Sequence, residues 1–126
     1  MRKNLFRGKN EHTGWAFGDL RNYEKNGAKA IFSHDLLHRI EVDPETAGQC
    51  STVPDKNGVL MYEGDIVKGL FLFGMEIKAV VAFQDGAFGL QWRRGGVTDF
   101  SAFTSLCNIT YEVIGNIHDN PELLEV

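Results

Sequence analysis

Glycine and proline recur along the whole chain and leave little room for long helices. The 126 residues include 14 glycines and 3 prolines. Both residue types are unfavourable inside helices and common in turns. Between them lie short segments with alternating polarity or with many β-branched and aromatic residues, which is typical of strands. We therefore predict an all-β fold with one or two short helical turns.

The strand pattern is clearest in the second half of the chain. Ile77, Ala79, Val81 and Phe83 would share one face, because side chains alternate with period two along a strand. The Asp-Gly pair at 85–86 favours a tight turn with positive φ, so the strands on either side of it should pair antiparallel. The predicted strands are 3–7, 15–20, 28–32, 39–42, 66–70, 77–83, 88–92 and 111–117.

Asp43 and Pro44 mark a short helical turn that we interpret as a domain boundary, since aspartate caps helices and proline favours their first position. Asp-Lys-Asn-Gly at 55–58 predicts a further turn. Residues 1–49 then form an N-terminal β meander, and residues 50–126 have a plausible size for an SH3-like β-barrel domain. We expect the meander to pack on the barrel, because it has few large apolar residues of its own.

Composition predicts a folded domain in the cytoplasm, without membrane contact. Hydrophobic residues make up 43% of the chain and charged residues 24%, close to globular averages. Apolar runs are far shorter than the roughly 20 residues of a membrane helix. No apolar stretch follows the basic residues at the N-terminus, so we expect no signal peptide. A reducing compartment implies that Cys50 and Cys107 are not paired in a disulfide.

Charge is unevenly distributed and bears on nucleic-acid binding. Residues 1–49 carry eight basic and seven acidic groups (+1), whereas residues 50–126 carry five basic and ten acidic groups (−5). The acidic half would repel a phosphate backbone. Basic groups beside an exposed aromatic residue could nevertheless bind a single strand by phosphate contacts and stacking; otherwise they form a solvated edge and the tryptophan belongs to the core. The candidate residues are Arg2, Lys3, Arg7, Lys9, Trp92, Arg93 and Arg94.

An apolar run is the main candidate for a binding surface. A buried central strand there would have to bury both faces, which a small barrel seldom allows. An exposed apolar hairpin on a monomer is an aggregation hazard unless a partner covers it. We favour a subunit interface in a homo-oligomer, with a core strand and a ligand pocket as the alternatives. The residues are Leu70, Phe71, Leu72, Phe73 and Met75.

No pattern predicts catalysis, a cofactor or a metal. His34 and His38 superficially match a zinc motif, but that motif needs a multi-turn helix and a third ligand, so we expect a polar loop or helical turn. Five of the eight aspartates adjoin glycine or proline and are interpreted as turn formers. Nucleophile elbows, phosphate loops and dinucleotide fingerprints are absent from the sequence.

Two motifs indicate local structure and a family. Tyr62-Glu63-Gly64-Asp65-Ile66-Val67 predicts a turn whose aspartate accepts backbone amides before a strand begins. Asn120-Pro121-Glu122 predicts a capped helical turn that returns Leu123 and Leu124 to the body. With Arg7-Gly8-Lys9, Trp15, Gly18-Asp19-Leu20 and Val42-Asp43-Pro44-Glu45-Thr46, these anchors resemble the YopX-like family of phage and prophage proteins. The resemblance implies an N-terminal β region, an SH3-like C-terminal domain and a phage or prophage origin, and it transfers no catalytic residue.

The residues and the resemblance together lead to a non-enzymatic, oligomeric interaction module whose partners are copies of itself or another phage or host protein. The alternative is a nucleic-acid-associated phage accessory protein that uses Arg93, Arg94 and the basic N-terminus.

Overall fold

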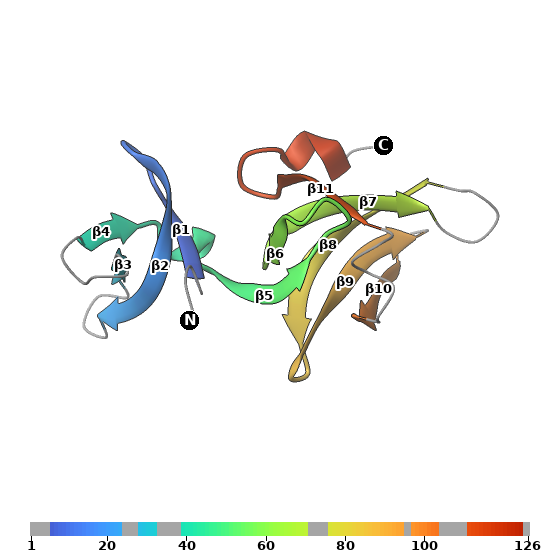
Figure 1. Ribbon diagram of the computed structural model, residues 1–126, viewed down its shortest axis with the longest axis horizontal. Helices are drawn as coiled ribbons and strands as arrows, with labels where there is room; N and C mark the ends of the chain where they lie inside the picture. Colours follow the sequence, from blue (N-terminus) through green and yellow to red (C-terminus); the bar gives the residue numbers. More distant parts are fainter. Residues whose placement is uncertain are drawn as a thin grey trace. The chain divides into compact units, whose positions relative to one another are not determined.

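A computed structural model describes residues 6–23, 28–32, 39–70, 76–94, 97–103 and 111–124 (Figure 1). Within these ranges every regular element is a strand or a 3₁₀ turn, so the all-β prediction is confirmed. The chain divides into two compact units, Met1–Cys50 and Ser51–Val126. This division falls between residues 50 and 51, one residue after the boundary expected from the sequence.

The first unit contains β1 (Phe6–Asn10), β2 (Gly14–Tyr23), β3 (Ala28–Phe32), β4 (Arg39–Val42) and η1 (Pro44–Thr46). β5 (Gly48–Pro54) begins in the first unit and ends in the second. The second unit continues with β6 (Leu60–Tyr62), β7 (Asp65–Leu70), β8 (Glu76–Gln84), β9 (Ala87–Arg94), β10 (Val97–Ala102), β11 (Glu112–Asn116) and η3 (Pro121–Leu124).

The first unit is an antiparallel meander in the order β4-β3-β2-β1-β5. Among the described residues its core contains Ala16, Ile31 and Val42, with Phe6, Leu20 and Ile40 packed against them. Gly8 allows β1 to lie close to this core, because a Cβ at that position would stand 2.6 Å from Cγ2 of Val42. The predicted cap of η1 is confirmed, since Asp43 Oδ1 accepts the backbone N–H of Glu45 at 3.0 Å.

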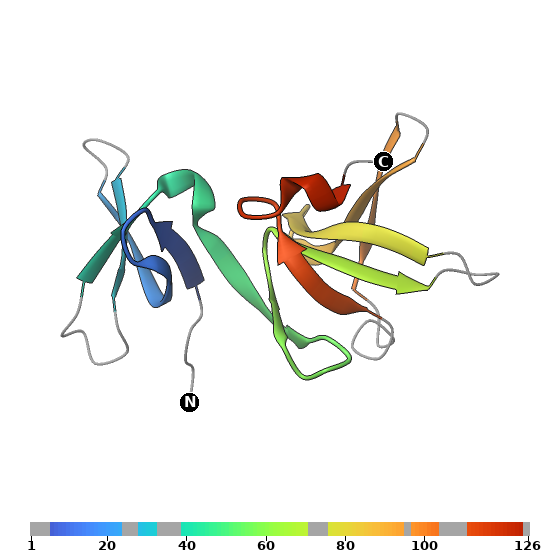
Figure 2. The ribbon, with the colours of Figure 1, turned by 90° about the horizontal axis from the view of Figure 1, so that it is seen from above.

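The second unit contains an antiparallel sheet in the order β10-β9-β8-β7-β11. Alternating residues of β7, β8 and β9 form a core on one face of this sheet, and Met61 of β6 packs into it. On the other face, η3 lies beside β11, as Figure 2 shows. A Cβ on Gly115 would stand 2.9 Å from Cδ1 of Leu123, so Leu123 returns to the sheet as predicted, whereas Leu124 is 40% exposed, contrary to the prediction. The core residues are Met61, Val67, Ala79, Val81 and Leu90.

Several strand predictions need correction. Residues 3–5 of the first predicted strand lie outside the described residues, β1 extends to Asn10 and not Arg7, and β5, β6 and β10 were not predicted. β6 has only three residues, and β5 contains small polar residues, a proline and Thr52 at φ +64°, a region that β-branched residues rarely adopt. Their pairing depends on partner strands and not on a strong local pattern. An SH3-like barrel stays a prediction for the second unit.

Candidate interaction surface

Asp55 is a buried acid whose carboxylate is used to fix the backbone. Its side chain is 3% exposed. Oδ1 accepts the N–H groups of Asn57 and Val59 at 2.8 and 2.9 Å, and Oδ2 accepts that of Val113 at 2.9 Å. Burial alone would raise the pKa of Asp55, but the amide donors from Val113, Val59 and Asn57, helped by Lys56, outweigh it and lower the pKa below 3.8. Asp55 therefore holds the β5–β6 turn against the start of β11.

Asp65 has a similar structural role in the Glu63-Gly64-Asp65 motif. It is also 3% exposed, and its Oδ2 accepts the N–H of Tyr62 at 2.8 Å. Gly64 has a φ of +93°, which suits glycine, and its N–H and C=O bond to Val81 O and Ile117 N. The predicted turn chemistry is confirmed. Both buried acids are thus part of the architecture, and their hydrogen bonds to backbone amides explain their burial without a ligand.

The apolar run that the sequence singled out falls mostly outside the described residues. Leu70 contributes its backbone to the end of β7, and Phe71, Leu72, Phe73 and Met75 lie in the range 71–75, which the structure does not describe. His34 and His38 also lie outside the described ranges. In the described part of the chain, no group of three or more histidines, cysteines or acids could hold a metal ion.

Of the nucleic-acid candidates, the structure describes the side chains of three, Arg7, Lys9 and Trp92. Arg7 is 7% exposed, and its guanidinium lies over the ring of Trp15 at 4.7 Å, so it packs inside the first unit. Trp92 is partly buried and packs against the core of the second unit, which agrees with the alternative that places this tryptophan in the core. Lys9 lies in β1, where its backbone N–H bonds to Thr46 Oγ1 at 2.8 Å. Arg2 and Lys3, and the side chains of Arg93 and Arg94, lie outside the described parts.

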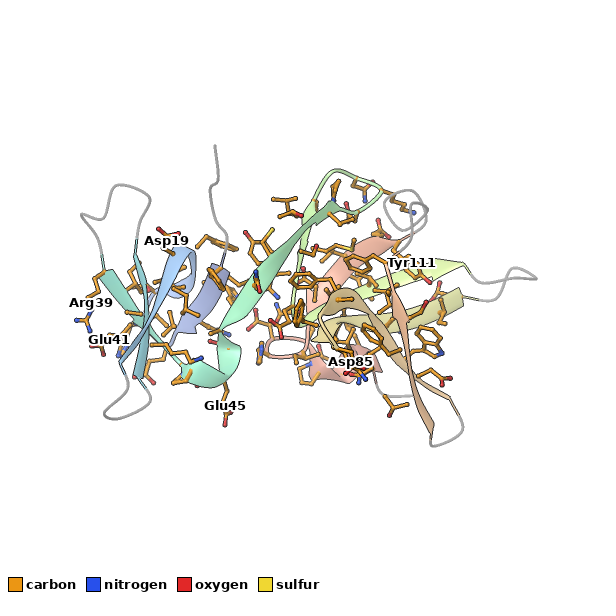
Figure 3. The ribbon with its side chains drawn as sticks, turned by 90° about the horizontal axis from the view of Figure 1, so that it is seen from below. Asp19, Arg39, Glu41, Glu45, Asp85 and Tyr111 are labelled. Atoms are coloured by element: carbon orange, nitrogen blue, oxygen red, sulfur yellow. The ribbon has the colours of Figure 1, made fainter. Side chains whose placement is uncertain are left out.

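The turn between β8 and β9 projects beyond the neighbouring strands of its sheet (Figure 1). The β7–β8 ladder ends at Val80, with one further bond from the Gly64 N–H to Val81 O, and the β9–β10 ladder ends at Gly89, with one further bond from the Phe103 N–H to Phe88 O at 3.1 Å. Asp85 and Gly86 form the two-residue turn with φ values of +53° and +82°, which confirms the predicted hairpin. We call the segment from Ala82 to Phe88 the hairpin tip; Figure 3 marks Asp85 in it.

Two phenylalanines stand opposite each other on the hairpin tip. Phe83 pairs with Phe88 across the strands, and their rings meet edge to face with centroids 4.9 Å apart. Phe83 remains 49% exposed, although its period-two position places it on the core-facing side of β8. Sequence alternation predicted the face correctly but not the exposure. The position of Phe83 next to the predicted turn could have indicated this exposure, because the ends of a hairpin often extend beyond the neighbouring strands.

The hairpin tip is also poor in charge. Asp85 is its one charged residue, and neither lysine nor arginine occurs from Ala79 to Trp92. The nearest basic residue before this stretch, Lys78, donates from Nζ to Leu123 O at 3.2 Å on the η3 side of the sheet. The tip therefore offers an aromatic pair beside a single negative charge.

Comparisons with known proteins give the family and the fold. The family described as "YopX protein" matches residues 5–125. The crystal structure of protein yopX from Bacillus subtilis is similar, with a TM-score of 0.57 and 24% identity over 95% of this chain and 97% of that chain. No curated protein matches the sequence significantly. In the described part of the chain, no helix is both long and apolar enough to cross a membrane.

Proposed function

Because the chain belongs to the YopX family, we propose that it is a non-enzymatic interaction module that binds other protein surfaces and is of phage or prophage origin. The observation that carries the proposal is the projecting hairpin tip with its half-exposed Phe83. Large aromatic side chains that remain accessible at a projecting site are typical anchors of protein interfaces.

The buried acids support a non-enzymatic role. Asp55 and Asp65 bond to backbone amides, whereas a general acid or base must reach a substrate proton. Self-association through Leu70 to Met75 remains part of the proposal on the strength of the sequence, as does a cytoplasmic location. The nucleic-acid alternative loses support, because Arg7 and Trp92 pack within their own units.

Photocrosslinking in bacterial cells that produce the protein tests the interaction function. A benzophenone amino acid is placed at position 83, and in a control protein at position 17, where Phe17 is similarly exposed at 44%. We expect a crosslinked adduct from position 83 and a much weaker one from position 17. The mass of the adduct distinguishes a second copy of this chain from a different protein. No adduct from position 83, or equal adducts from both positions, would contradict the proposal.

A further inference from the structure

We propose that the hairpin tip binds a short segment of another protein in which an apolar side chain lies next to lysine or arginine. This inference rests on the interaction function proposed above and specifies the chemistry of the partner. Three properties of the tip carry it: its apolar rings, its small area and its charge.

The aromatic pair is suited to hold an apolar side chain. Phe83 and Phe88 lie on paired strands on either side of a two-residue turn, and their edge-to-face contact restricts both rings. A contact site that is already ordered loses little conformational freedom on binding. The exposed part of Phe83 is therefore a preformed anchor point.

The area of the tip excludes a stable dimer held by the tip alone. A phenylalanine buries at most about 150 to 250 Å², so two partly buried rings offer a few hundred at best. Stable interfaces between folded proteins bury roughly 1,200 to 2,000 Å². A second copy meeting this one through the hairpin tip would fall far short, whereas a peptide segment with one inserted side chain fits the available surface.

The charge of the tip and of its unit favours a cationic partner. The tip carries Asp85 and no basic residue, and the second unit has five basic and ten acidic residues, a balance of −5. Such a field attracts positive segments and repels negative ones. A lysine or arginine beside the apolar anchor could pair with Asp85 or lie against an aromatic face.

The test measures the binding of labelled peptides to the full chain by fluorescence anisotropy. The probe is a peptide of alternating leucine and lysine, and its twin has glutamate in place of lysine. We expect the lysine peptide to bind at least about tenfold more tightly than the twin. Phe83→Ser should weaken binding of the lysine peptide by about tenfold or more, as for an interface anchor. The matched control Phe17→Ser, in the first unit, should leave binding unchanged.

A second variant keeps the test decisive if Phe83→Ser fails to fold. Asp85→Asn removes the one charge of the tip, and asparagine tolerates the positive φ of this turn. It should weaken binding of the lysine peptide several-fold while the circular dichroism spectrum stays the same. The inference would be overturned if the two peptides bound equally or if neither bound. It would also be overturned if Asp85→Asn, or a folded Phe83→Ser, bound the lysine peptide as tightly as the wild type. If position 83 still crosslinks in cells, only the partner chemistry fails and the proposed function stands.

Discussion

At the scale of single residues, aspartates at turns have two structural roles, one local and one between distant segments, that cannot be told apart in the sequence. Asp43 caps the short helical turn that follows it, a local role that its neighbour Pro44 already indicates. Asp55 bonds locally to its own turn and also to Val113, 58 residues away. The local bonds follow from turn chemistry. The distant bond depends on the fold bringing the start of β11 beside the turn.

We predict that Asp55→Asn lowers the free energy of unfolding by about 1 to 3 kcal/mol at neutral pH. If the asparagine oxygen keeps the bonds to the N–H groups of Asn57 and Val59, its NH₂ group faces the Val113 N–H, and the bond to Val113 is lost because both groups are donors. The folded state lowers the pKa of Asp55, so its stabilisation is present above the unfolded value near 3.8 and is lost as the pH falls through the lower folded value. Urea melts of both proteins at neutral pH and at about pH 3 should show the difference shrinking in acid. A difference that is constant with pH would contradict this role.

At the scale of elements, two glycines determine how closely segments approach the sheet. A Cβ on Gly89 of β9 would stand 2.4 Å from the backbone oxygen of Ser101 in the paired strand β10. A Cβ on Gly115 of β11 would stand 2.6 Å from Asn120 Oδ1 and 2.9 Å from Leu123 Cδ1. Asn120 Oδ1 also accepts the Asn116 N–H at 3.3 Å, a bond that ties the C-terminal turn back to β11. Neither close approach is visible in the sequence.

We predict that Gly89→Ala destabilises the protein more than Gly115→Ala. The obstacle at Gly89 includes a strand backbone that cannot move without breaking its ladder, whereas the obstacles at Gly115 are side chains that can shift. Overpacking of this kind costs about 1 to 3 kcal/mol. Urea denaturation gives the order of the two losses. Hydrogen exchange should increase at residues 117–124 in Gly115→Ala; the reverse order of stability, or unchanged exchange there, would refute the explanation.

At the scale of the whole molecule, the chain forms two compact units with separate cores. Among the described residues, the first core is built around Ala16, Ile31 and Val42, with Phe6, Leu20 and Ile40 packed against it, and Gly8 lies close to Val42. The second core draws on β6, β7, β8 and β9. The apolar run from Leu70 to Met75 belongs to the second unit by sequence, and it carries the prediction of a homo-oligomer.

We predict that replacing both Phe71 and Phe73 by serine shifts the mass measured by light scattering towards the monomer, because exposed apolar runs associate to leave water. The circular dichroism spectrum should keep its β signal. Phe83→Ser is the matched control and should leave the mass unchanged, since the hairpin tip is too small to hold a dimer. An unchanged mass in the double variant, or loss of its fold, would argue against an interface at this run.

The sequence by itself determined the all-β class, the cap at Asp43, the turn at Gly64-Asp65 and the hairpin at Asp85-Gly86. Each of these depends on the conformational preferences of a few adjacent residues, which the chain carries wherever it folds. The sequence also indicated the family, through motifs spread over most of its length. The tertiary structure alone decided that β5, β6 and β10 are strands, that Arg7 and Trp92 pack inward, and that Phe83 stays exposed. These outcomes depend on which distant segments meet and where neighbouring strands end, and no local pattern encodes that.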